Sequence, residues 1–254
     1  MLFRSIIYGP IHSRRLGTSL GVELMPLDHK LCTFNCVYCE CGWNTPVSHP
    51  KLPTREEVKA AMEAKLKEMA NDQCLDVITF SGNGEPTLHP DFLGIIEDTC
   101  ALRDHYCPNA KVSVLSNSTQ LGRPDVVQAL RLCDNRILKL DAGTDIMMRR
   151  IDLPVNSNLT VDQILRWLAP FNGDFTLQTC FLRGEHKGEP IDNTTPEELA
   201  AWYQAIETLR PKQIMIYVID RKTPEEHLSK ISREQMESIA APLIAKGFEV
   251  SISA

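Results

Sequence analysis

Beyond residue 50 the chain alternates between short apolar runs rich in β-branched residues and longer segments in which apolar residues recur every three or four positions. The short runs, which predict strands, cover residues 74–80, 111–117, 136–142, 174–181 and 213–219. The longer segments predict amphipathic helices over residues 54–69, 91–104, 124–132, 160–168, 195–209 and 232–244. Strands that alternate with helices indicate βα units and a parallel sheet.

Three of the predicted helices begin with a capping box, in which a Ser or Thr is followed three positions later by Glu or Gln. The boxes are Thr54–Glu57, Thr195–Glu198 and Ser232–Gln235, and Pro196 occupies the first helical position of the second. In the last helix the periodicity predicts five buried residues, which are Met236, Ile239, Ala240, Leu243 and Ile244.

The number of βα units predicts an open barrel. Residues 21–26 are taken as the first strand, which makes six βα units, and residues 247–253 predict a seventh strand. No linker rich in Pro, Ser or Gly divides the chain, so we expect one domain over residues 1–254. A barrel with fewer than eight strands leaves a lateral opening through which a large substrate could enter.

Composition excludes several classes of protein. With 43% hydrophobic and 24% charged residues, the chain of 254 residues can bury an ordinary core. The N-terminus lacks a signal-peptide pattern and no apolar run is long enough to span a membrane, so a cytoplasmic protein without a membrane partner is expected. A net charge of -6 does not favour nucleic acid as a partner, although Arg14–Arg15 and Arg149–Arg150 could form a local basic patch.

Four of the nine cysteines lie within ten positions, Cys32, Cys36, Cys39 and Cys41. Because cytoplasmic thiols stay reduced, such a group indicates metal or redox chemistry. Three thiolates on a short loop can hold an iron–sulfur cube and leave one iron without a protein ligand. A zinc site with Cys41 or His29 as the fourth ligand is the alternative. Incidental burial suits the scattered cysteines, which are Cys74, Cys100, Cys107, Cys133 and Cys180.

Polar residues follow the predicted strands at the edge where parallel α/β folds place their sites. Ser81–Pro86 contains glycines that let backbone carbonyls approach a ligand, and Glu85 could meet an ammonium group; a tight turn is the alternative. Further site candidates are Ser116, Asn117, Lys139, Asp141 and Gln178. Candidate substrate contacts, which could equally be solvated surface charges, are Arg14, Arg15, Arg183, Glu185, His186, Asp220, Arg221 and Lys222.

The stretch "CTFNCVYC" resembles the cluster motif of the radical S-adenosylmethionine superfamily. Together with "GPIHSRRLGTSLGVELMP" and "TFSGNGEPTLHP", it resembles a subgroup of iron–sulfur oxidoreductases related to the wybutosine-type tRNA-modifying enzymes. The resemblance implies a partial (β/α)6 barrel of the radical SAM type. It also implies a [4Fe-4S] cluster held by Cys32, Cys36 and Cys39, with S-adenosylmethionine on the fourth iron. Cys41 is not assigned as a ligand.

The resemblance also implies where the cosubstrate binds. The glycine-glycine-glutamate-proline motif of the family maps onto Asn83–Pro86, with Asn83 in place of the first glycine. Tyr38, before the third cysteine, is expected beside the adenine. The full set of expected cosubstrate contacts is Tyr38, Gly82, Asn83, Gly84, Glu85, Ser116, Asn117, Asp141 and Gln178.

The expected activity is reductive cleavage of S-adenosylmethionine to methionine and a 5'-deoxyadenosyl radical, which abstracts hydrogen from a small-molecule or nucleoside substrate. An external one-electron reductant such as flavodoxin or ferredoxin would supply the electron. Two alternatives stay open: a glycyl-radical-enzyme activase that acts on a protein partner, and a zinc-stabilised binding protein without catalysis. The short chain, in which no dedicated tRNA-binding domain is expected, argues against a tRNA substrate and allows a protein substrate.

Overall fold

The structure is a computed structural model that describes residues 2–13, 16–69 and 75–254. Arg14, Arg15 and Cys74, which the sequence analysis singled out, lie outside the described residues. The chain forms two compact units. The first unit comprises Met1–Cys32, Asn44–Ser116 and Gln120–Ile137, and the second comprises Thr33–Trp43, Asn117–Thr119 and Leu138–Ala254. The expectation of one domain over residues 1–254 stays a prediction.

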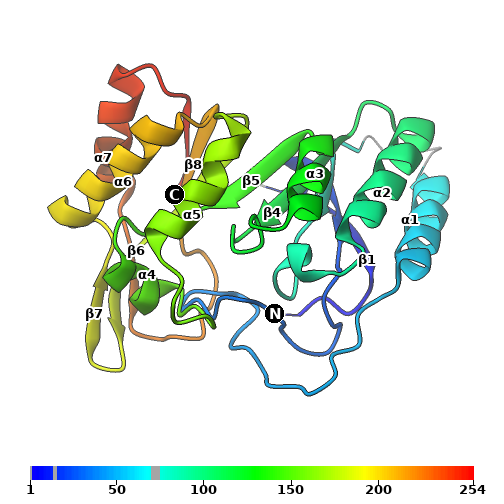
Figure 1. Cartoon of the computed structure of the whole chain (residues 1–254), viewed down its shortest axis with the longest axis horizontal. Helices are drawn as coiled ribbons and strands as arrows, with labels where there is room; N and C mark the ends of the chain where they lie inside the picture. The colour runs from blue at the N-terminus through cyan, green and yellow to red at the C-terminus, as the bar shows by residue number, and fades with distance from the viewer. Residues whose placement is uncertain (1, 14–15, 70–74) are drawn as a thin grey trace. The chain divides into compact units, whose positions relative to one another are not determined.

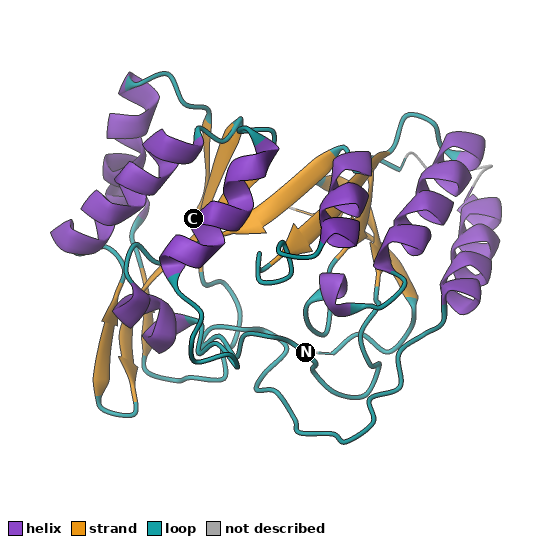
Figure 2. Ribbon diagram, in the orientation of Figure 1, coloured by secondary structure: helices purple, strands orange, loops and turns teal. Residues whose placement is uncertain are grey.

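The first unit is a sheet with helices packed on it. Its elements are β1 (Ile7–Ser13), β2 (Gly17–Val22), α1 (Arg55–Met69), β3 (Val77–Phe80), the 3₁₀ helix η1 (Pro86–Leu88), α2 (Phe92–Tyr106), β4 (Lys111–Ser116) and α3 (Pro124–Leu132). Strands β2, β3 and β4 are parallel neighbours, and β1 pairs antiparallel with β2. Figure 1 shows α1, α2 and α3 side by side, and Figure 2 shows them in front of these strands.

The second unit repeats this pattern and adds a small antiparallel extension. Its helices are α4 (Asp145–Ile151), α5 (Val161–Leu168), the 3₁₀ helix η2 (Ala169–Phe171), α6 (Pro196–Leu209) and α7 (Arg233–Ala245). Its strands are β6 (Thr176–His186), β7 (Glu189–Asp192), β8 (Gln213–Val218), β9 (Leu228–Lys230) and β10 (Val250–Ser253), while β5 (Asn135–Lys139) spans the boundary between the units. Strands β6, β8 and β10 are parallel, whereas β7 and β9 pair antiparallel with the carboxyl-terminal part of β6.

The prediction of an α/β fold with parallel strands and outer helices is confirmed. Helix α3 has the predicted bounds, and β10 is the predicted seventh strand. The capping boxes at Thr54 and Ser232 form with both hydrogen bonds. Among the described residues, no helix is long and apolar enough to cross a membrane.

The predicted first strand was wrong in its position. Residues 17–22 form β2, and Glu23 begins the loop that follows it. The antiparallel strand β1 before it was missed, as were α4, β7 and β9. These elements are short and have no clear periodic pattern of their own. Strands β1 and β7 form hairpins with the neighbouring strands β2 and β6, whereas β9 pairs with β6 residues that are distant in sequence.

Two predictions about helix residues were also wrong. Ile244 is 54% exposed, because it lies in the last turn of α7 beyond the core-facing residue Leu243. At α6, the Thr195 side chain caps the helix, but the Glu198 carboxylate does not complete the box. It accepts hydrogen bonds from the backbone N–H groups of Gly143 and Thr144 instead.

Candidate functional site

The cysteine motif crosses the boundary between the two units. Cys32 is the last residue of the first segment of the first unit, whereas Cys36 and Cys39 belong to the second unit. The described cysteines are free thiols; Cys36 is buried, and Cys32 and Cys39 are partly exposed. Among the described residues, no three Cys, His, Asp or Glu side chains are grouped so as to hold one metal ion.

In the second unit the cysteine loop is held by backbone hydrogen bonds. The N–H groups of Asn35 and Val37 donate to the carbonyls of Asp152 (2.8 Å) and Ile151 (2.9 Å), respectively. The carbonyl of Val37 accepts from Glu225 N–H at 3.2 Å. Phe34 and Val37 are buried. The loop has no regular secondary structure, so these bonds and two apolar anchors determine its path.

Buried charges surround Cys36. Its Sγ accepts from Lys139 Nζ at 2.9 Å and lies 3.4 Å from Asp152 Oδ1. The Lys139 ammonium also lies 3.0 Å from Asp141 Oδ2 and 2.5 Å from Asp152 Oδ1. Burial lowers the pKa of Lys139, but the two carboxylates and Cys36 outweigh it and hold that pKa well above its usual value. A fixed cation beside a thiol favours the thiolate, which is the form that binds iron. The residues around Cys36 therefore fit a cluster ligand.

Asp141 and Tyr38 are engaged with each other. The Tyr38 hydroxyl donates to Asp141 Oδ2, and Asp141 Oδ1 accepts from Cys180 N–H at 2.8 Å. Lys139 Nζ lies 5.0 Å from the centre of the Tyr38 ring, and Tyr217 OH is 3.4 Å from Tyr38 OH. Both Asp141 oxygens thus already accept hydrogen bonds from protein groups, and a ribose contact by this residue stays a prediction.

The remaining candidates of the second unit occupy different settings. Asn117 Nδ2 donates to Thr33 Oγ1 at 2.8 Å, and Asn117 Oδ1 accepts from Thr119, so Asn117 holds the start of the cysteine loop. Gln178 is buried on β6, and its backbone carbonyl accepts a hydrogen bond from Leu140 N–H at 3.0 Å.

Most of the candidate substrate residues of the second unit are in ion pairs. Arg183 pairs with Asp192 at 2.8 Å, and Arg221 pairs with Glu40 at 2.7 Å. His186 Nδ1 lies 2.7 Å from Glu225 Oε2, and its ring packs on Trp43. The His186–Trp43 ring contact connects β6 to the cysteine loop, and the Arg221–Glu40 pair connects the segment after β8 to the same loop. The sequence pattern did not indicate these connections.

In the first unit the loop Ser81–Pro86 follows β3, as expected. A Cβ atom on Gly84 would overlap the carbonyl oxygen of Leu31, with which Gly84 forms a parallel bridge. The Glu85 side chain caps η1 by accepting from Thr87 N–H at 3.2 Å. Ser116 is buried at the end of β4. The loop is therefore close-packed against the residue that precedes Cys32.

Asn83 is fully buried, and its side chain connects three segments. Its Oδ1 accepts from Phe3 N–H at 2.8 Å, and its Nδ2 donates to the carbonyls of Phe3 (2.8 Å) and Pro26 (2.9 Å). The amide oxygen and nitrogen thus both have protein partners, and the side chain holds Phe3, which precedes β1, and Pro26, which follows β2, against the glycine loop. This explains physically why Asn replaces a glycine here.

Sequence reasoning missed Glu23, a buried carboxylate in the loop after β2. Burial raises its pKa to about 7, although hydrogen bonds from the backbone N–H groups of Asn83, Met25 and Leu24 lower it. The sequence placed Glu23 inside the predicted strand 21–26, so its position directly after a strand end became visible only in the structure.

The raised pKa of Glu23 predicts a pH dependence of stability. The unfolded Glu loses its proton near 4.5 and the folded one near 7, so the folded state binds more protons between these values. The free energy of unfolding is therefore expected to fall from about pH 4.5 to about pH 7, by roughly 3 kcal/mol at about 1.4 kcal/mol per pKa unit. Urea unfolding of the wild type and Glu23→Gln at pH 5 and pH 8 checks this. Because the unfolded Glu is already largely ionised at pH 5, the stability difference between the two proteins should change by about 2.5 kcal/mol between these pH values. A constant difference would contradict the assignment.

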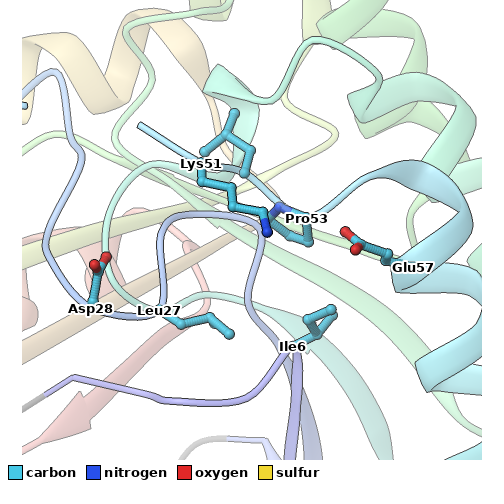
Figure 3. A pocket seen from close by; sticks show the side chains of 7 residues that line it. Ile6, Leu27, Asp28, Lys51, Pro53 and Glu57 are labelled. Carbon is cyan, nitrogen blue, oxygen red and sulfur yellow. The ribbon is translucent and has the colours of Figure 1, made fainter. Parts of the chain in front are cut away.

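The first unit also contains a pocket of about 380 Å³, shown in Figure 3. It is lined by Ile6, Leu27, Asp28, Lys51, Leu52, Pro53 and Glu57. His29 is the next residue in sequence after the lining residue Asp28, and its Nδ1 lies 2.6 Å from Asp28 Oδ1. Within the described part of the chain, His29 Nε2 is buried without a hydrogen-bond partner.

Several proteins of known sequence are similar to the chain. A UPF0026 protein of Synechocystis sp. is 30% identical over 227 residues, which is 86% of this chain and 77% of that protein. A protein of Brachyspira hyodysenteriae named GTPase Obg is 28% identical over 91% of this chain, and a UPF0026 protein of Helicobacter pylori is 32% identical over 70%. The chain spans 32% and 57% of the lengths of these last two proteins.

Solved structures share the fold. SuiB of Streptococcus suis bound to S-adenosylmethionine matches with a TM-score of 0.64 at 14% identity, over 91% of this chain and 50% of that chain. TYW1 with a lysine–pyruvate adduct matches with a TM-score of 0.64 at 16% identity, over 91% and 74%. The likeness to both structures confirms the predicted type of α/β fold.

The match of residues 29–195 to the Radical SAM superfamily includes the cysteine motif, the glycine loop and the strand ends that carry Asn117, Asp141 and Gln178. Because this match covers more than half of the 254 residues, the chain belongs to the radical SAM superfamily.

Proposed function

We propose that the protein binds a [4Fe-4S] cluster through Cys32, Cys36 and Cys39 and cleaves S-adenosylmethionine reductively. In the radical SAM superfamily the bound cluster supplies the electron that breaks the carbon–sulfur bond. The resulting 5'-deoxyadenosyl radical would take hydrogen from a small-molecule or nucleoside substrate. An external one-electron reductant would supply the electrons.

The observation that carries this proposal is the setting of Cys36. The thiol is buried, its loop is held by backbone hydrogen bonds, and the Lys139 ammonium lies 2.9 Å from its Sγ. A cation at this distance offsets the negative charge of a thiolate that ligates iron. The protein thereby contributes a prepared donor and excludes water from it.

The proposal assigns the cosubstrate to two groups of residues. The backbone of the Ser81–Pro86 loop supplies acceptors for its amino group, and the second group comprises Tyr38, Ser116, Asn117, Asp141 and Gln178. Fold relatives support this cosubstrate, since SuiB and anSMEcpe were both solved with S-adenosylmethionine bound.

The test is anaerobic reconstitution with iron and sulfide, followed by reduction with dithionite in the presence of S-adenosylmethionine. Chromatography should detect 5'-deoxyadenosine and methionine in equal amounts. Bound zinc without acid-labile sulfide, together with no cleavage, would overturn the proposal and favour a zinc-stabilised binding protein. Cleavage stimulated by a candidate nucleoside, rather than by a protein partner, would separate the proposed substrate class from an activase.

A further inference from the structure

Glu23 is a carboxylate in the interior of the first unit, directly after β2, and only 1% of its surface is exposed. Its Oε1 accepts from Met25 N–H at 2.7 Å, and its Oε2 accepts from Asn83 N–H at 2.5 Å. One side chain therefore links the chain that leads toward the cysteine motif with the glycine loop after β3.

The carboxylate also explains the glycine at position 82. A Cβ atom there would overlap Glu23 Oε2, and Gly82 has a φ of +150°, which other residues rarely adopt. The absence of a side chain at Gly82 makes room for Glu23, and Glu23 in turn binds the next N–H group. The two residues thus determine the backbone path at the start of the loop.

The other polar groups of Asn83 are hydrogen-bonded to residues other than Glu23. Its side-chain amide is engaged with Phe3 and Pro26, and its carbonyl accepts from Leu31 N–H at 2.9 Å. The remaining polar group of Asn83 is the N–H that Glu23 accepts. The peptide bond between Gly82 and Asn83 therefore takes its orientation from Glu23.

We propose that Glu23 is a positioning residue for S-adenosylmethionine: by holding the Gly82–Asn83 peptide, it sets the backbone acceptors that receive the cosubstrate's amino group. The inference rests on the proposed function. Glu23 acts through the loop and does not itself contact the cosubstrate. A carboxylate suits this role because both of its oxygens accept hydrogen bonds, whereas a glutamine amide offers only one acceptor oxygen to two N–H groups.

The test compares Glu23→Gln with a matched control, a substitution of Asp76, whose side chain contacts the other end of β2. Asp76 also accepts a backbone hydrogen bond, from Thr18 N–H at 2.7 Å, and it also lies against a glycine, Gly17. Unlike Glu23, Asp76 is exposed. It directly precedes β3, whereas the Ser81–Pro86 loop follows the other end of that strand. Asp76→Asn therefore removes the same kind of contact away from the proposed site.

Three quantities are measured on each protein: the amide hydrogen exchange of residues 81–85 without cofactors, the iron and sulfide content after reconstitution, and the KM and kcat for S-adenosylmethionine cleavage. Glu23→Gln should accelerate exchange in the loop and raise KM about tenfold, which corresponds to about 1.4 kcal/mol, with the cluster content and kcat nearly unchanged. Asp76→Asn should behave as the wild type does. Gly82→Ala, which disturbs the same contact from the loop, should also raise KM and provides a second test where Glu23→Gln folds poorly.

Accelerated exchange with an unchanged KM would overturn the inference, because Glu23 would then be structural only. An unchanged exchange rate would overturn it as well. If the reconstituted wild type cleaves no S-adenosylmethionine, the proposed function fails, and the inference fails with it. A normal wild type with an unaffected Glu23→Gln variant contradicts the inference alone.

Discussion

The Cys36→Ala variant is expected to lose most of its reconstituted iron and sulfide and to form no detectable 5'-deoxyadenosine. Removal of this thiol leaves two of the three proposed ligands, Cys32 and Cys39, and two thiolates do not hold a four-iron cube firmly. It also removes the acceptor that Lys139 contacts at 2.9 Å. Iron and acid-labile sulfide analysis, the visible absorption of the reconstituted protein and chromatography of the products check the result.

Two other cysteines provide controls for this variant. Cys107 lies at the end of α2 in the first unit, outside the motif, and burial raises the pKa of its thiol. Cys41 lies in the motif region but is not assigned as a ligand. Both Cys107→Ala and Cys41→Ala should retain cluster and cleavage. Full cluster content in Cys36→Ala would refute the ligand assignment, and loss of the cluster in Cys41→Ala would add Cys41 to the ligands.

The Lys139→Met variant is expected to lose about 3–5 kcal/mol of unfolding free energy, because it leaves buried carboxylates without their cation. In the wild type the ammonium lies 3.0 Å from Asp141 and 2.5 Å from Asp152, and both carboxylate side chains are almost fully buried. Methionine fills a similar volume, so the loss would report charge rather than a cavity. Anaerobic urea unfolding of the cluster-free protein at pH 8 measures it.

An exposed ion pair of the same unit is the matched control for Lys139. Lys212 lies 3.1 Å from Asp174, and both side chains are exposed. Lys212→Met should lose less than about 1 kcal/mol, since water already solvates both charges. Equal losses of unfolding free energy in the two variants would contradict the prediction, because they would show that the carboxylates around Cys36 are solvated and do not need the Lys139 ammonium for their stability.

Local signals explain which elements were predictable. Helix α3 begins with Pro124 and has a clear apolar face, so its bounds follow from residues near one another in sequence. Helix α4 has only seven residues, and the hydroxyl of its cap, Thr144, donates a hydrogen bond to the carboxylate of Glu198 in another helix. Strands β7 and β9 exist through pairing with β6. The bond to Glu198 and the pairing of β9 join distant residues, and the hairpin strand β7 has only four residues, so none of them leaves a periodic pattern in the chain.

The candidate site divides in the same way. The spacing of the cysteines indicated a cluster site, and the resemblance to the superfamily, together with its place after a predicted strand, identified the glycine loop. It did not reveal that Asp141 holds Tyr38 and Lys139, or that Asn83 binds Phe3 and Pro26 through its side chain. A polar residue at a strand end predicts proximity to a site, but its hydrogen-bond partners depend on which distant backbone groups lie within about 3 Å.

The sequence by itself determined the superfamily, the order of most βα units and the three candidate ligands, because these depend on spacing and on the 3.6- and 2-residue periods of local structure. Tertiary structure alone decided which charges are buried together. It placed Lys139 between Asp141 and Asp152 beside Cys36, and it placed Glu23 against Gly82 and Asn83. Two of these contacts join residues far apart in the chain: Cys36 and Lys139 are 103 positions apart, and Glu23 and Asn83 are 60 positions apart. Their energies come from burial and hydrogen-bond geometry that only the folded chain creates.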